Sequence, residues 1–111
     1  MEKFAVGSVV LVSFPFSNLK GKKIRPALVL AKAEFDNLIL CQITSKPYAS
    51  KSAIRIESTD FINGELPVVS YIRPDKLFTA DAFIIEKTAG KLTEKGIDTA
   101  LQSVRALFTS K

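Results

Sequence analysis

The chain has 111 residues, 47% hydrophobic and 24% charged, with a net charge of +5, which argues against disorder and favours an anionic partner. Its single cysteine excludes an internal disulfide, and the absence of histidine removes the usual ligands of a zinc site. No segment has the roughly 18 apolar residues of a membrane helix and the start does not resemble a signal peptide, so we expect one cytoplasmic domain spanning residues 1–111.

Short strands are predicted along most of the chain, because β-branched residues cluster between turn signals. The segment SAIRIES alternates isoleucine with charged residues, which is typical of a half-buried strand. The five prolines are expected at strand edges or in turns. The predicted strands cover residues 7–14, 26–33, 37–43, 52–58, 66–72 and 76–85, and five or six strands at this spacing favour a compact antiparallel barrel.

The spacing of the apolar residues changes from that of strands to that of a helix after the break predicted at Ala89-Gly90. Thr93 can cap a helix, with Leu92 and Ile97 placed as a hydrophobic staple. Apolar residues then recur at helical spacing over about 15 residues. We therefore predict a mainly β fold with one C-terminal helix.

A basic segment, KGKKIRPALVL, precedes the second predicted strand and contains Lys20, Lys22, Lys23 and Arg25. Pro26 fixes its own φ and pushes Arg25 into an extended conformation. A planar, permanently charged guanidinium held in this way suits a phosphate that gains charge in a transition state. The alternative is an ordinary surface arginine at the start of a strand.

A second candidate segment, ITSKPYASKS, follows the third predicted strand. Thr44 and Ser45 could hold phosphate oxygens, Lys46 and Lys51 add positive charge, and Tyr48 could stack on a base. The alternative is a simple strand end and turn.

A third candidate pair, Arg73 and Asp75, flanks Pro74 at alternate positions, so both side chains should point to the same side of an extended chain. They could form a structural ion pair, or supply a cation and a proton acceptor to a reacting phosphate. The only cysteine, Cys41, lies in an apolar run and is predicted to be a small buried thiol. The scattered acids form no metal-binding pattern, and we expect neither a metal nor another cofactor.

Together these segments resemble the MazF/PemK/Kid family of toxin endoribonucleases over nearly the whole chain. The similarity begins at GSVVLVSFPFSNLKGKKIRPALVL, continues through ITS, and ends in DKLFTAD and the terminal helix. The resemblance implies an SH3-like barrel, usually homodimeric. It also implies metal-independent, sequence-specific cleavage of single-stranded RNA, and neutralisation by a cognate acidic antitoxin, with which such toxins also bind DNA.

By the same resemblance, Arg25 and Thr44 correspond to the catalytic arginine and threonine, and Ser45 to a neighbouring substrate-binding hydroxyl. Arg73 and Asp75 match an acid and base proposed in one branch of the family. Asp75 is therefore a third candidate catalytic residue. The substrate-binding candidates are Ser45, Lys20, Lys22, Lys23, Lys46, Tyr48, Lys51 and Arg73.

The sequence departs from many family members at FPFSNLKG, where an acidic Asp-Pro version is common. Two rival functions remain. One is a non-catalytic RNA-binding barrel, and the other is a protein-directed toxin like the CcdB gyrase poisons. The second is disfavoured, because those poisons use a C-terminal tryptophan and this chain has no tryptophan.

Overall fold

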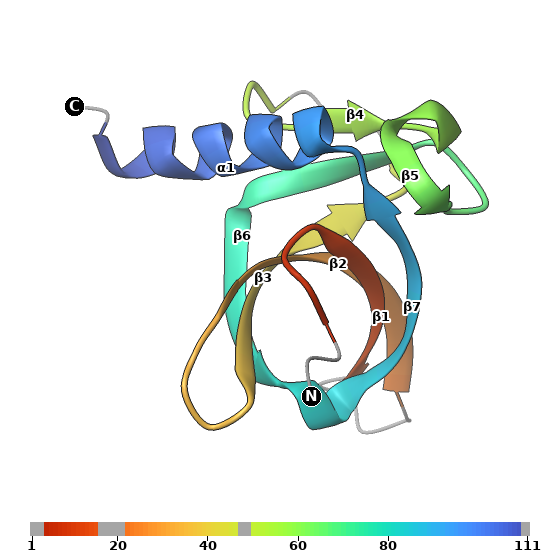
Figure 1. Cartoon of the computed structure of the whole chain (residues 1–111), viewed down its shortest axis with the longest axis vertical. Coiled ribbons are helices and arrows are strands. Elements are labelled where there is room, and N and C mark those ends of the chain that lie inside the picture. Colours follow the sequence, from red (N-terminus) through yellow and green to blue (C-terminus); the bar gives the residue numbers. More distant parts are fainter. Residues whose placement is uncertain (1–3, 16–21, 47–49, 110–111) are drawn as a thin grey trace.

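The computed structural model describes residues 4–15, 22–46 and 50–109, which fold into a curled antiparallel sheet crossed by one helix (Figure 1). In the described residues the sheet has seven strands. They are β1 (Ser8–Pro15), β2 (Lys22–Lys32), β3 (Asn37–Thr44), β4 (Ile54–Ile56), β5 (Phe61–Gly64), β6 (Ser70–Asp81) and β7 (Ile85–Leu92). Single 3₁₀ turns, η1 (Ser58–Asp60) and η2 (Ala82–Ile84), precede β5 and β7, and the helix is α1 (Glu94–Thr109).

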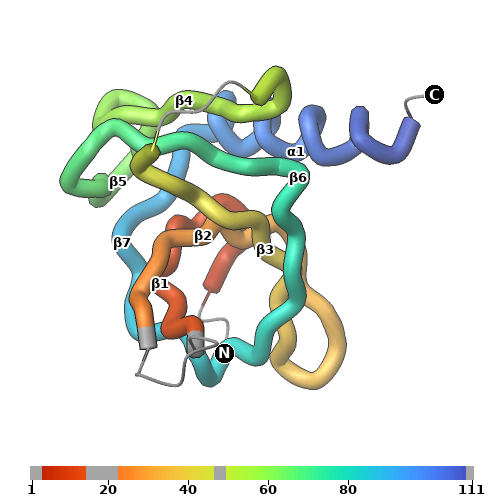
Figure 2. The backbone as a smooth tube through the Cα atoms, turned by 180° about the vertical axis from the view of Figure 1, so that it is seen from behind, coloured from red at the N-terminus to blue at the C-terminus, as the bar shows by residue number. Residues whose placement is uncertain are grey.

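The strand order is β4-β6-β3-β2-β1-β7-β5. Strands β1, β2 and β3 form a meander, and β6 and β7 close around its two sides, so the sheet curls into a ring (Figure 1). The two edge strands, β4 and β5, lie near each other on the side of the ring that carries α1 (Figures 1 and 2). The predicted antiparallel barrel with a C-terminal helix is confirmed.

The two faces of the sheet carry separate hydrophobic cores, because successive side chains of a strand point to opposite faces. The helix core packs between the sheet and α1, and it contains Val9, Leu28, Cys41, Ile72, Leu92 and Ala100, all at most 1% exposed. The barrel core fills the curl of the sheet, and it contains Val10, Val12, Ala27, Val29 and Leu40, all 0% exposed. Both cores together fix the position of every strand around the site described below.

Strands β2 and β3 separate at one end. Their pairing runs from Ala27 opposite Gln42 to Lys32 opposite Leu38, whereas the first residues of β2 continue to pair with β1. Pro26 lies where the β2–β3 ladder stops, and it has no amide hydrogen to donate across the gap. We call this opening between the start of β2 and the end of β3 the fork.

Strand β6 is continuous, although two separate strands are predicted for this region. The ladder with β3 shifts between Gln42 opposite Arg73 and Cys41 opposite Leu77, so the three residues between Arg73 and Leu77 form a bulge. Pro74 lies in that bulge, where its missing amide hydrogen leaves no ladder bond unmade. The expectation that every proline marks a strand edge or turn is therefore wrong for Pro26 and Pro74.

Other expected boundaries also differ. Only Ile54–Ile56 of the predicted strand 52–58 forms a strand, because η1 begins at Ser58. The Asp60 carboxylate accepts a hydrogen bond from the Glu57 amide and so fixes the start of this turn. Strands β5 and β7 are missing from the prediction, which takes Ala89-Gly90 as a break although both residues lie within β7.

The terminal helix follows its prediction closely. It spans 16 residues, and the Thr93 hydroxyl accepts a hydrogen bond from the Gly96 amide at 3.1 Å, as an N-cap residue does. Ile97, Leu101 and Val104 pack against the helix core. No helix in the described part of the chain is both long and apolar enough to span a membrane.

Candidate active site

A cleft of about 750 Å³ opens at the fork. Its walls come from the start of β2, the end of β3, the segment between β5 and β6, and the middle of β7. Apolar residues are prominent in the lining, and they are Leu11, Ile24, Pro26, Ile43, Leu66, Pro67, Val68 and Ala89. The remaining lining residues are polar or charged, so the cleft can hold a ligand that is partly apolar and partly ionic.

Arg25 and Thr44 both line this cleft, one from each side of the fork. The β2–β3 pairs Ala27–Gln42, Leu28–Cys41 and Val29–Leu40 share one register. Continued two residues further, that register sets Arg25 across from Thr44. Strand alternation also puts both residues on the face of the sheet that carries the barrel core. Two of the three predicted catalytic residues are thus brought together although they are 19 positions apart in the sequence.

Thr44 is half-buried, and its hydroxyl oxygen accepts a hydrogen bond from the Lys46 amide at 3.1 Å. This bond turns the chain after β3 and leaves the hydroxyl proton available to a ligand. Arg25 is exposed at its position on β2. Lys23, Ser45 and Lys46, three predicted substrate-binding residues, line the same cleft and are also exposed.

Arg73 and Asp75 do not line the cleft, and they lie on β6, the strand next to β3 in the sheet. Arg73 is opposite Gln42, and therefore on the same face as Thr44. Its guanidinium Nη2 is 3.8 Å from the Asp75 carboxylate Oδ2, with the side chains 29% and 41% exposed. The expectation that the two point to the same side agrees with this distance. An ion pair this long and this exposed contributes little to stability.

The other predicted residues are more distant or outside the described structure. Lys51 lies in an exposed turn and does not line the cleft. Lys20 and Tyr48 lie outside the described residues, as does the side chain of Lys22, whose backbone begins β2.

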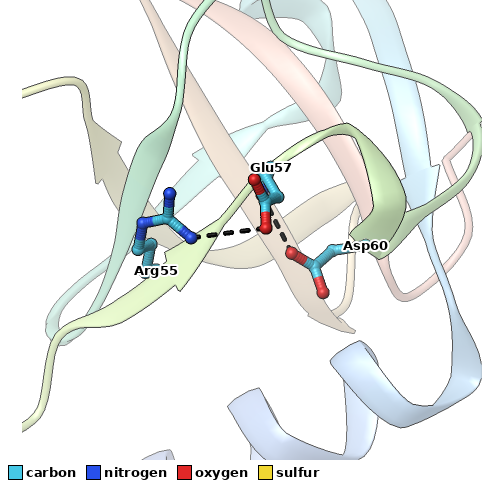
Figure 3. Close-up of polar contacts among 3 residues, drawn as sticks. All are labelled: Arg55, Glu57 and Asp60. Atoms are coloured by element: carbon cyan, nitrogen blue, oxygen red, sulfur yellow. Dashed lines mark hydrogen bonds and ion pairs between the residues drawn. The ribbon is translucent and has the colours of Figure 1, made fainter.

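Two further residues, which were not among the predicted site residues, lie in the same cross-strand row as Thr44. Tyr71 of β6 is paired with Thr44 on one side and with Arg55 of β4 on the other. Arg55 is bound through Nη1 to the Glu57 carboxylate at 3.3 Å, next to the Asp60 carboxylate that accepts the Glu57 amide (Figure 3). The alternation in SAIRIES and SYIRPD could have indicated that these side chains share a face.

Four further polar residues line the cleft, namely Glu65, Ser70, Lys87 and Thr88. Ser70 is buried and donates its hydroxyl to the Val68 carbonyl at 3.0 Å, which fixes the segment before β6. Their local sequences carry no signal, because strand pairings between distant segments bring them to the cleft, namely β5 with β7, β6 with β4, and β7 with β1.

Cys41 is fully buried in the helix core. Burial, aided by the negative charge of Asp75, raises the pKa of its thiol from 9.0 to about 12. The thiol is therefore neutral at physiological pH, and it fills space rather than acting as a nucleophile.

Residues 5–108 match the model of the family described as PemK-like, MazF-like toxin of type II toxin-antitoxin system. The chain belongs to this family, which confirms the resemblance noted from the sequence. No curated protein matches the chain significantly.

Solved structures with the same fold include an endoribonuclease from a Mycobacterial species in complex with its cognate antitoxin. It has a TM-score of 0.76 and 12% identity, covering 98% of this chain and 99% of that one. MazE-MazF from Deinococcus radiodurans has a TM-score of 0.72 and 16% identity, with both chains fully covered. The Mycobacterium tuberculosis toxin MazF-mt6 has a TM-score of 0.66 and 14% identity, covering 92% and 98%. At these identities the likeness concerns the fold.

Proposed function

We propose that this protein is a sequence-specific, metal-independent endoribonuclease toxin that cuts single-stranded RNA in the cytoplasm. The observation that carries the proposal is the placement of Arg25 across the fork from Thr44, in a cleft with further lysines. Family membership supports it, and two of the similar structures are described as endoribonucleases.

The cleft suits attack by the ribose 2′-hydroxyl on the adjacent phosphorus. The bond from the 2′-oxygen to phosphorus forms as the bond to the 5′-oxygen breaks, giving a 2′,3′-cyclic phosphate. The leaving 5′-oxygen takes a proton from water and becomes a 5′-hydroxyl. Arg25 stabilises the charge that gathers on the phosphate oxygens, and Thr44 and Ser45 hold the phosphate in place. Asp75 is the candidate acceptor of the 2′-hydroxyl proton, with Arg73 holding its carboxylate.

The test uses an RNA oligomer containing the cut site and a second oligomer with one deoxy sugar immediately 5′ of the cut. In excess chelator, the all-ribose oligomer should be cut and the substituted one should survive. Arg25→Ala should lower the rate by on the order of 10²–10³, as expected for a partner of transition-state charge. Arg105→Ala, an exposed arginine on α1, is the matched control and should cut normally.

Three results would contradict the proposal. Cutting of the deoxy oligomer at the same bond would show that water or a side chain is the nucleophile. Normal cutting by a folded Arg25→Ala protein would remove Arg25 from the site. Binding of RNA without any cutting would favour the non-catalytic barrel instead.

We also propose a homodimer. The C-terminal half of α1 projects beyond the ring of strands (Figure 1), and Leu107 and Phe108 there are 40% and 73% exposed. Burying these side chains against a second copy would remove the largest apolar surface on the helix. Light scattering at micromolar concentration should give twice the mass of one chain, and Phe108→Ser should lower it toward that of a monomer.

The neutralising partner should be an acidic antitoxin segment. Four cations line the cleft, namely Lys23, Arg25, Lys46 and Lys87, against one acid, Glu65. This excess should steer an acidic chain to the place where RNA would bind. Two of the similar structures are described as complexes with an antitoxin.

A further inference from the structure

The single carboxylate in the cleft is at odds with a purely phosphate-binding surface. Glu65 lines the cleft together with Lys46 and Lys87. Among the described residues, its side chain takes part in no ion pair or hydrogen bond, although these cations line the same cavity. Glu65 is exposed, so water can reach its carboxylate. A negative charge in this position repels phosphate, and it favours a ligand group that donates hydrogen bonds.

Glu65 is also held at a fixed place on the wall. It follows Gly64, which pairs with Gly90 of β7 and has φ +67°. A Cβ on Gly64 would come within 2.6 Å of the Gly90 Cα, so only glycine permits this close approach of β5 to β7. Glu65 therefore leaves a rigid strand end, next to the β7 residues that form the adjoining wall.

A carboxylate accepts hydrogen bonds through two oxygens and donates none. The phosphates of RNA are acceptors too, so the partners left for Glu65 are base N–H groups and 2′-hydroxyls. Guanine is the base that presents two adjacent donors, N1–H and the N2 amino group, on its Watson–Crick edge. Two parallel, charge-assisted bonds to one carboxylate are the strongest pairing open to Glu65.

We propose that Glu65 recognises a guanine base bound in the cleft and thereby contributes to the sequence preference of cleavage. The inference rests on the proposed function for its substrate class, single-stranded RNA. The cations that line the cleft would hold the phosphates, while the apolar lining residues accommodate the face of the base.

The test measures binding of 2′-O-methyl heptamers, which cannot be cut, to the full chain by fluorescence anisotropy. Each heptamer consists of uridines with a central guanosine, inosine, adenosine or cytidine. Inosine keeps N1–H and lacks the amino group. The wild-type protein should prefer guanosine to adenosine by about tenfold, in line with one bidentate base contact, and inosine should fall between them. Glu65→Gln should lose this order, and Glu86→Gln, an exposed acid that does not line the cleft, should keep it.

A second comparison, of how Glu65→Gln changes the affinity for each heptamer, separates base recognition from simple charge repulsion. Glu65→Gln should strengthen binding of the adenosine and cytidine heptamers, because it removes a charge that repels phosphate. It should weaken binding of the guanosine heptamer relative to these two. If Glu65→Gln strengthens all four heptamers equally, or if the wild type shows no preference for guanosine, the proposal is wrong. It is equally wrong if only binding of an acidic antitoxin peptide responds to the substitution.

Binding and cutting are read separately in this design. If no all-ribose RNA is cut but the guanosine preference depends on Glu65, base recognition stands and the proposed enzyme activity fails. If RNA is cut and the guanosine preference is absent or unaffected by Glu65→Gln, the activity stands and the role of Glu65 is refuted.

Discussion

Gly7 joins three parts of the fold, so its replacement by alanine should be strongly destabilising. Its amide donates to the Val29 carbonyl of β2 at 2.9 Å, and its carbonyl accepts from the Leu92 amide of β7 at 3.0 Å. Its φ of +95° is in the range that residues with a side chain rarely adopt. A Cβ there would lie 2.6 Å from Cγ1 of Ile97 on α1, and nearer still to Cδ1.

The expected cost has two parts. A residue with a Cβ in the left-handed region costs roughly 1–2 kcal/mol, and displacing the packed Ile97 side chain costs about 1–3 kcal/mol. Gly7→Ala should therefore lower the free energy of unfolding by about 2–5 kcal/mol, a large part of the roughly 5–15 kcal/mol typical of a domain. Adding Ile97→Val should recover part of the packing cost and none of the backbone cost.

Urea unfolding at one fixed protein concentration measures the effect. Gly96→Ala is the matched control, because its Cβ would meet nothing nearer than 3.4 Å and alanine favours a helix. It should stabilise the protein by about 0.4–1 kcal/mol. A Gly7→Ala protein within about 0.5 kcal/mol of wild type would refute the reasoning, since either part alone exceeds that value.

Three further outcomes are expected. Because the pKa of buried Cys41 is raised to about 12, the native thiol should resist alkylation at pH 8 and react on unfolding; fast native labelling would contradict its burial. The stabilisation that comes from keeping this thiol neutral is complete below pH 9.0 and is lost as pH rises toward 12. A Cys41→Ala protein should therefore lose less free energy of unfolding than the wild type over that pH range. Asp75→Asn should slow RNA cutting far more than Arg105→Ala if Asp75 accepts a proton, whereas equal rates would leave it only an ion-pair role.

How much the sequence predicts depends on how local the determining contacts are. The Arg25–Pro26 step and the Thr44–Ser45 strand end are visible in a few neighbouring residues, so the core of the candidate site could be proposed from them. The helix was equally predictable, because Thr93 and the apolar stripe after it are local signals.

The missed features arise from pairings between distant segments. Gly90 suggests a break when only its neighbours are considered, yet in the fold it lies inside β7, where β5 approaches closely. Glu65 reaches the cleft through the same pairing, and Lys87 through the pairing of β7 with β1, where it lies opposite Leu11. Pro74 suggests the end of a strand, and only the register of β6 against β3 shows that a bulge accommodates it.

The pairing of β1 with β7 also determines at which point of synthesis the cleft can be complete. A nascent chain that has emerged only as far as β3 already carries Arg25 and Thr44, but it lacks the walls supplied by residues 65–70 and 87–89. Since chains leave the ribosome N-terminus first, the cleft can assemble only after most of the reading frame has been translated. Under the proposed endoribonuclease function, the chain would therefore complete most of its own translation before it could cut the message that encodes it.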